Sequence, residues 1–265
     1  MTAAAAHAPG RGLRLTVLGS GTAVPVPDRF PAGYLVQSAR CTAMVDCGPG
    51  TLRRLAQAGV DLADLDAVFL THFHTDHCAD IGPLLFALHG PRYAGRKPLH
   101  LFAAPGLERF LAVLATVWPW TLPRGYELAV RELTPGALQF ADVAVQALPI
   151  RHTAQSLGYR ITAADGACAA FSGDADECDE LVELARGVDV FVCDAAFPDH
   201  DRRDGHLTPG LAGEHAERAG ARSLWLTHFY PECDGLDVQA MARARFRGEV
   251  VAATDLLART LQRAT

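Results

Sequence analysis

Three histidines and one aspartate lie within the six residues from His72 to His77. They follow the apolar run 67–70, which predicts a short buried strand, and precede the apolar segment 81–88, which predicts a helix. Imidazole nitrogen and carboxylate oxygen are ligands that Zn²⁺ prefers. The spacing therefore predicts a metal site, and a histidine-rich loop without a metal is the weaker alternative. These groups exceed what one tetrahedral ion with an open position needs, so we expect two adjacent ions.

The order of these residues indicates how their side chains lie. His72 and His74 are two residues apart, so in an extended chain their side chains leave the same face. Asp76 and His77 follow where the chain turns, and they can direct a carboxylate and an imidazole to a neighbouring point.

Three further candidates each come just after an apolar segment that predicts a strand: His152, Asp174 and His228. Functional groups of α/β sheets gather beyond strand ends. Taken singly, a histidine at such a place is more often an ordinary surface residue. Together, the three supply the ligands that a two-metal site would still lack.

Asp46, at the end of the apolar segment 41–45, has two interpretations. Its carboxylate could cap the helix expected at 51–58. It could instead hold the outer nitrogen of a ligating imidazole, which fixes the tautomer of that imidazole and raises its basicity. The second interpretation requires the tertiary fold to bring Asp46 near His72 or its neighbours.

The composition is that of a soluble globular protein, with 49% hydrophobic and 20% charged residues in a chain of 265. Strands and helices alternate along the chain, which predicts the α/β class. We expect residues 13–265 to form one domain and residues 1–12 a flexible tail. The formal net charge of -6 argues against tight binding of polyanions.

Seven scattered cysteines without a CxxC pair are typical of reduced thiols in the cytosol. The N-terminus lacks the apolar core of a signal peptide. The apolar stretch 99–120 is interrupted by charged residues and prolines, so we expect no membrane span. We therefore expect a cytoplasmic protein. The apolar loop at Trp118-Pro119-Trp120 is expected to pack against the edge of the core, and the alternative is a lip over the site.

Several short motifs carry a resemblance to a known family. Besides His72-x-His74-x-Asp76-His77, they are Leu18-Gly19-Ser20-Gly21-Thr22, Asp46-Cys47-Gly48-x-Gly50-Thr51, Ser172-Gly173-Asp174, Gly205-His206-Leu207-Thr208 and Leu226-Thr227-His228-Phe229. The chain resembles the ribonuclease Z-like branch of the metallo-β-lactamase superfamily. The resemblance implies an αββα sandwich, in which two β-sheets pack face to face with helices on the outer faces.

The resemblance also implies roles for the site residues. The implied ligands of two zinc ions are His72, His74 and His152 for one ion, Asp76, His77 and His228 for the other, and Asp174 between them. Asp46 corresponds to the aspartate that the family places behind a ligand, and His206 to a histidine that assists the leaving group. Manganese or iron could use the same ligands.

Two features depart from the ribonuclease Z pattern. That group inserts a long arm that grips tRNA between the positions of His152 and Asp174, but here only 21 residues separate them. The family's block His-Glu-Ala-Thr reads Cys193-Asp194-Ala195-Ala196. The shorter aspartate leaves open whether Asp194 reaches His206.

The hypothesis from sequence is hydrolysis of a phosphodiester. Two zinc ions about 3.5 to 4 Å apart would share a water and lower its pKa from about 15.7 towards 7, giving a hydroxide nucleophile. The expected catalytic residues are Asp76, Asp194 and His206, with His206 protonating the departing alkoxide.

The missing arm and the negative net charge favour a small diester, such as a cyclic nucleotide, over RNA. The alternative is a tRNA 3′-end endoribonuclease that uses a partner subunit's surface in place of the arm, and the family precedent makes us expect a homodimer. Hydroxide attack on a carboxylic ester, thioester or lactone is also compatible. A non-catalytic metal- or nucleotide-binding module would not need to keep all these ligands and His206.

Overall fold

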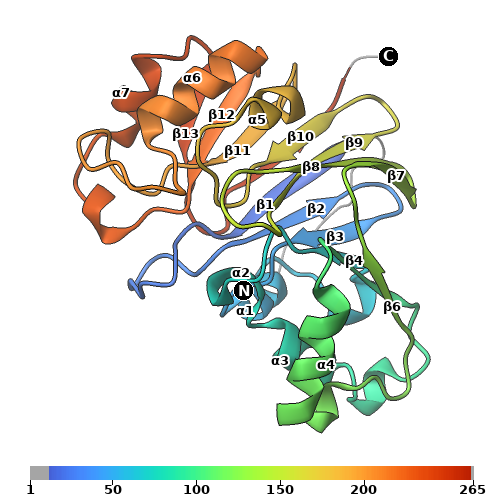
Figure 1. Cartoon of the computed structure of the whole chain (residues 1–265). Coiled ribbons are helices and arrows are strands. Elements are labelled where there is room, and N and C mark those ends of the chain that lie inside the picture. Colours follow the sequence, from blue (N-terminus) through green and yellow to red (C-terminus); the bar gives the residue numbers. More distant parts are fainter. Residues whose placement is uncertain (1–11, 264–265) are drawn as a thin grey trace.

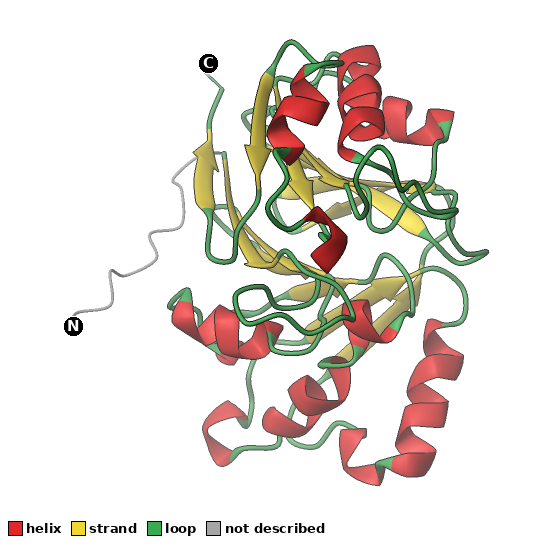
Figure 2. Ribbon diagram, turned by 90° about the vertical axis from the view of Figure 1, so that its left-hand side faces the viewer, coloured by secondary structure: helices red, strands yellow, loops and turns green. Residues whose placement is uncertain are grey.

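The computed structural model describes residues 12–263, in which two β-sheets face each other and helices cover their outer faces (Figures 1 and 2). The sheet order is β14-β1-β2-β3-β4-β5-β6 in one sheet and β13-β12-β11-β10-β9-β8-β7 in the other. The expected αββα sandwich is confirmed. All but the last residue of the tail expected at 1–12 lies outside the described residues.

The first sheet consists of β1 (Leu13–Gly19), β2 (Gly33–Gln37), β3 (Thr42–Val45), β4 (Ala67–Phe69), β5 (Leu99–Ala103), β6 (Leu128–Glu132) and β14 (Ala258–Leu261). The second consists of β7 (Gly136–Phe140), β8 (Val143–Pro149), β9 (Leu157–Ala163), β10 (Cys168–Phe171), β11 (Val190–Asp194), β12 (Ser223–Thr227) and β13 (Glu249–Ala252). The described helices are α1 (Thr51–Gln57), α2 (Thr75–Cys78), α3 (Ile81–Ala87), α4 (Leu107–Val117), α5 (Asp179–Leu184), α6 (Pro209–Ala219) and α7 (Val238–Arg243). Single 3₁₀ turns lie at Leu62–Asp64, Pro91–Tyr93, Pro119–Thr121 and Pro231–Cys233.

The central strands are apolar on both faces, because the opposite sheet covers one face of each sheet and helices cover the other. In β2, Tyr34 and Val36 point into the core between the sheets, whereas Leu35 packs beneath the helices of the first sheet. This alternation is the two-residue period of a strand. Strands buried on both faces are nearly continuous hydrophobic runs in sequence. This explains why the apolar runs of the sequence predict these strands.

The helices extend these cores outwards. Buried side chains of α1, α3 and α4 join the core on the outer face of the first sheet, and those of α5, α6 and α7 join the corresponding core of the second. Figure 1 shows the two sets of helices on opposite sides of the sandwich. Helix α6 begins with a capped first turn, because the Thr208 hydroxyl accepts a hydrogen bond from the Leu211 N–H and Pro209 occupies the first turn.

Parallel strands in both sheets end at candidate site residues. β3 runs parallel to β4, and β10, β11 and β12 run parallel to one another. Asp46 follows β3, and Asp174 and His228 follow soon after β10 and β12. The carboxyl ends of these strands therefore bring residues from distant parts of the chain to the same edge of the sandwich.

β9 and β10 are joined by a tight turn in which the Gly166 N–H donates to the carbonyl of Ala163, so no long arm is inserted there. Trp118 packs against Gly82 of α3, and the residues that line the groove beside it include no candidate ligand. This agrees with packing rather than with a lip over the site. No helix within 12–263 has the length and apolar character needed to cross a membrane.

We expect Phe69→Ala to destabilise the fold strongly. Phe69 is fully buried between the sheets, where its ring stacks on Phe102 with a centroid distance of 4.7 Å. The resulting cavity should cost about 3 to 5 kcal/mol in the free energy of unfolding, measured by urea denaturation. Phe86→Ala is the matched control, since Phe86 is 53% exposed and its loss should change stability by about 0.5 kcal/mol or less. Equal losses in the two variants would contradict this assignment of the core.

Candidate metal centre

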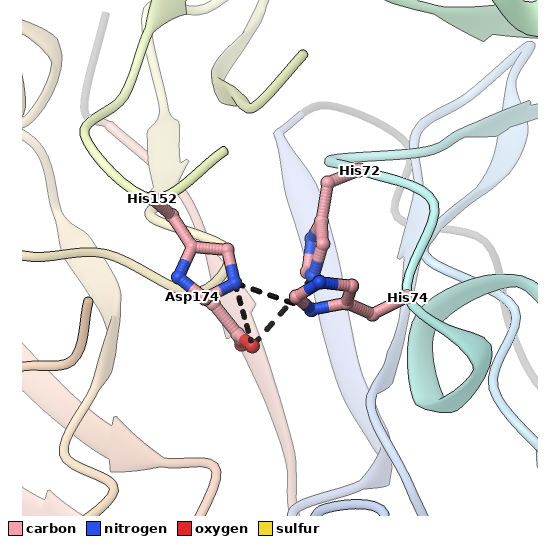
Figure 3. Close-up of side chains that lie close together, drawn as sticks. All are labelled: His72, His74, His152 and Asp174. Carbon is pink, nitrogen blue, oxygen red and sulfur yellow. Dashed lines mark hydrogen bonds and ion pairs between the residues drawn. The ribbon is translucent and has the colours of Figure 1, made fainter. Parts of the chain in front are cut away.

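The described residues contain three overlapping groups of side chains that could each hold a metal ion. Within each group, one ligand atom per residue lies within 4.8 Å of the others. The groups are His72, His74, His152 and Asp174; Asp76, His77 and His228; and Asp174, Asp194, His206 and His228. Figure 3 shows the four side chains of the first group pointing towards one another. Every ligand expected from the sequence therefore lies in one of these groups.

Thr71, immediately before the first histidine, orients two residues of the site. Its hydroxyl donates to the carboxylate of Asp46, with oxygen distances of 3.0 and 2.9 Å, and lies 3.1 Å from His72 Nδ1. Because that hydroxyl proton is directed to Asp46, the hydroxyl oxygen accepts the Nδ1–H of His72. The lone pair of His72 is then on Nε2, a buried atom that lacks a hydrogen-bond partner in the described part of the chain. Sequence reasoning gave Thr71 no role, although its place directly after a buried strand was a usable signal.

Asp46 holds a second imidazole. His77 Nδ1 lies 2.8 Å from Asp46 Oδ2, so its N–H donates to the carboxylate and leaves Nε2 to face the cluster. The residue at the N-cap of α1 is Gly50, so Asp46 does not cap that helix. Of the two interpretations of Asp46, helix cap or partner of an imidazole, the structure shows the second, because the carboxylate contacts His77. Such a contact fixes the ring orientation and the basicity of a ligating histidine.

His152 is oriented by the backbone. Its Nδ1 donates to the carbonyl of Gly205 at 2.8 Å, and its Nε2 lies 3.2 Å from His74 Nδ1. In the second group, His77 Nε2 lies 3.3 Å from His228 Nε2. With zinc–nitrogen bonds of about 2.0 to 2.1 Å, two ligands of one tetrahedral ion are separated by about 3.3 to 3.4 Å. Both nitrogen pairs therefore fit two ligands of a single ion.

The charge of the site also fits bound cations. Asp46, Asp76, Asp174 and Asp194 are all buried, and within residues 12–263 their ion-pair partners are all histidines. Asp174 lies 3.0 Å from His77 Nε2 and 3.2 Å from His228 Nε2. Buried carboxylates are costly without a compensating positive charge, which divalent ions would supply.

The pKa values of the histidines differ within the cluster. Burial, reinforced by the imidazole of His77, lowers the pKa of His72 to about 2, and burial lowers the pKa of His152. Both are thus neutral, which is the form that binds metal. Burial also lowers the pKa of His228, but the carboxylates of Asp174, Asp194 and Asp76 together outweigh burial and raise that pKa to about 10. At His228, a proton and a metal ion compete for the same nitrogen.

Asp194 does reach His206. Its Oδ2 lies 2.9 Å from His206 Nδ1 and also accepts the Ala175 N–H at 3.1 Å, while its Oδ1 lies 3.6 Å from His228 Nδ1. Burial lowers the pKa of His206, but the hydrogen bond and the charge of Asp194 outweigh it, so the pKa is raised above its usual value. The shorter aspartate therefore suffices for the contact that the sequence left open.

The backbone is adapted to these close approaches. Asp46 and His228 have φ values of 61° and 63°. These values lie in the left-handed region, which residues other than Gly, Asn and Asp rarely adopt. At Gly173 a Cβ would lie only 2.7 Å from Thr71 Cβ, so glycine allows the segment leading to Asp174 to approach the first sheet.

Comparisons with known proteins agree with this geometry. A family model described as the β-lactamase superfamily domain matches residues 42–229. The chain belongs to this superfamily. It is 33% identical over 273 residues to a protein named Ribonuclease Z from Mycobacterium bovis (strain BCG / Pasteur), an alignment that covers 92% of this chain and 96% of that relative.

Solved structures share the fold. The metallo-β-lactamase fold protein YhfI from Bacillus subtilis has a TM-score of 0.81 and 26% identity, and the alignment covers 93% of this chain and 98% of that one. The short form of human tRNase Z has a TM-score of 0.77 and 22% identity, over 94% of this chain and 99% of that one. The expected superfamily and its ribonuclease Z-like character are confirmed, and the chain is a metal-dependent hydrolase.

We expect Asp46→Asn to weaken metal binding by about 10- to 100-fold, because the loss of the carboxylate leaves His77 less basic and less well oriented. Asparagine tolerates the positive φ at this position, so the backbone should be retained. Competition with a chromophoric zinc chelator measures the affinity. Asp66→Asn is the control, since Asp66 pairs with Lys97 outside the ligand groups. An unchanged zinc affinity for Asp46→Asn would contradict the prediction that the Asp46 carboxylate strengthens metal binding through His77.

Proposed function

We propose that this hydrolase uses two zinc ions to cleave a small phosphodiester, such as a cyclic nucleotide. The observation that carries the proposal is the pair of ligand groups on either side of Asp174, with the His206–Asp194 contact beside them. The proposed ligands are His72, His74 and His152 for one ion, Asp76, His77 and His228 for the other, and Asp174 for both.

Divalent ions at these positions would polarise a phosphoryl oxygen and lower the pKa of water. The residues around them carry out the rest of the chemistry. Asp46 and Thr71 hold two imidazoles in the tautomers that present Nε2. Asp76 lies 3.4 Å from His228 Nε2 and adds a buried negative charge beside the reacting centre.

His206 is the proposed general acid. Its ring lies 5.1 Å from that of His152 and 5.6 Å from that of His228, so it borders both ligand groups. Asp194 accepts the Nδ1–H and stabilises the imidazolium, which leaves Nε2–H to be donated to the departing alkoxide. Asp194 thus acts through His206, and no side-chain nucleophile is needed.

Two observations support a small diester. The tight turn at Gly166 stands where ribonuclease Z proteins carry the arm that grips tRNA, and the net charge of -6 disfavours a polyanion. The second candidate is tRNA 3′-end cleavage, which the 33% identity to a protein named Ribonuclease Z favours. Ester, thioester or lactone hydrolysis uses the same site. The homodimer and the cytoplasmic location stay predictions.

His206→Ala should lower kcat by about 10²- to 10⁴-fold, the usual contribution of a general acid, while the metal content stays at the wild-type level. The control is His200→Ala, because His200 is exposed on the same segment and contacts no ligand group. Steady-state kinetics with bis-p-nitrophenyl phosphate and elemental analysis give the two readouts. Loss of metal in His206→Ala would instead make His206 a ligand.

Removal of metal should abolish phosphodiester turnover, and added zinc should restore it, because the ligand groups supply no nucleophile of their own. The measurement is hydrolysis of bis-p-nitrophenyl phosphate after dialysis against a chelator. A parallel comparison of cyclic AMP, pre-tRNA and a lactone assigns the substrate class. Preference for pre-tRNA, or turnover of the lactone alone, would overturn the small-diester proposal, and binding without turnover would identify a non-catalytic module.

A further inference from the structure

A cavity of about 390 Å³ adjoins the proposed metal centre next to Asp76. We call it the Val26 pocket. The residues that line it include Val26, Arg29, Phe30, Pro31 and Asp76. Asp76 belongs to the second ligand group, so the cavity borders the proposed metal centre. Its size is at the lower end of the range for small-molecule sites, about 300 to 1,000 Å³.

The loop that forms the outer wall of the pocket is fastened at both ends by Asp255. The carboxylate of Asp255 accepts the backbone N–H of Ser20 at 3.0 Å and that of Phe30 at 3.0 Å. Between them, the Gly21 N–H donates to the carbonyl of Phe30 at 2.8 Å. The two ends of the loop are thereby held together, and the wall exists before any ligand binds.

The aromatic part of the wall is held on two sides. The guanidinium of Arg54 lies 4.7 Å from the centroid of the Phe30 ring, and Arg54 Nε also donates to Asp255 at 3.2 Å. A Cβ on Gly50 would lie 2.1 Å from the Phe30 ring, so the ring rests directly on the backbone of Gly50. Gly50 has a φ of 89°, which favours glycine there.

The chemistry of the walls selects an uncharged group. Three of the residues that line the pocket are prolines, which offer no backbone N–H, and Ala23, Val26 and Phe30 add apolar surface. Arg29 is the lining cation, but its Nη2 already binds Asp234 at 2.8 Å. Beside the buried carboxylate of Asp76, such walls disfavour an anion and favour a flat, uncharged group.

We propose that the Val26 pocket binds a planar, uncharged group carried by the alcohol part of the diester, which in a cyclic nucleotide is the nucleobase on the ribose. This inference rests on the proposed function, and it names the part of the substrate that gives specificity. The pocket lies against the metal centre and has room for one such group.

Val26→Trp, which fills the pocket, tests the proposal. In the wild type, kcat/KM for cyclic AMP should exceed that for the base-free ribose 3′,5′-cyclic phosphate. In Val26→Trp, KM for cyclic AMP should rise about tenfold or more, the scale of a lost base-stacking contact, while turnover of the base-free diester is retained. The matched control is Val24→Trp, because Val24 lies on the same loop, is 41% exposed and does not line the pocket. Equal effects on both substrates in Val26→Trp would overturn the proposal.

Binding of adenosine, measured by isothermal titration calorimetry, separates the pocket from the reaction. Adenosine should bind the wild type and Val24→Trp, and should bind Val26→Trp about tenfold more weakly or worse. Equal adenosine binding by all three proteins would overturn the proposal that the Val26 pocket binds the base. If the wild type hydrolyses neither cyclic diester, the proposed function fails, and the adenosine titration still decides the pocket. Ala23→Phe serves as a second filling variant should Val26→Trp not fold.

Discussion

The buried charge of Asp174 is the constraint on which the candidate site depends. Its carboxylate faces imidazoles from three separate segments, with nitrogen distances of 3.0 Å to His77, 3.2 Å to His228 and 3.6 Å to His152. A carboxylate in such a place is stable only when positive charge or metal is held around it. The strands, tight turns and hydrogen bonds that surround the site serve to keep that arrangement in place.

The sandwich meets this constraint by using both sheets. The first sheet delivers His72 to His77 after β4, and the second delivers Asp174 and His228 after β10 and β12. The imidazoles are then fixed from behind, by Thr71 and Asp46 on one side and by the carbonyl of Gly205 on the other. The candidate ligand nitrogens are thus oriented by hydrogen bonds to the opposite side of each ring.

The two flanks of the site differ in chemistry. On one, the hydrogen-bonded His206–Asp194 pair lies beside His152 and His228. On the other, the Val26 pocket adjoins Asp76 with apolar walls held by Asp255. A diester whose departing oxygen lies near His206 and whose planar substituent lies in the pocket would use both flanks. The same fold can therefore pair one reaction centre with a specificity set by a single loop.

Sequence alone indicated the candidate ligands and most of the framework. The spacing of His72, His74 and His77 and the apolar runs before them are local signals, because neighbouring residues set the direction of side chains in a strand. Edge strands β7 and β14 gave a weaker signal, since most of their residues are exposed or only half-buried. Only the tertiary structure decided that Asp46 contacts His77, 31 residues away, and that Asp194 reaches His206. Such contacts depend on how the two sheets pack, which no local pattern encodes.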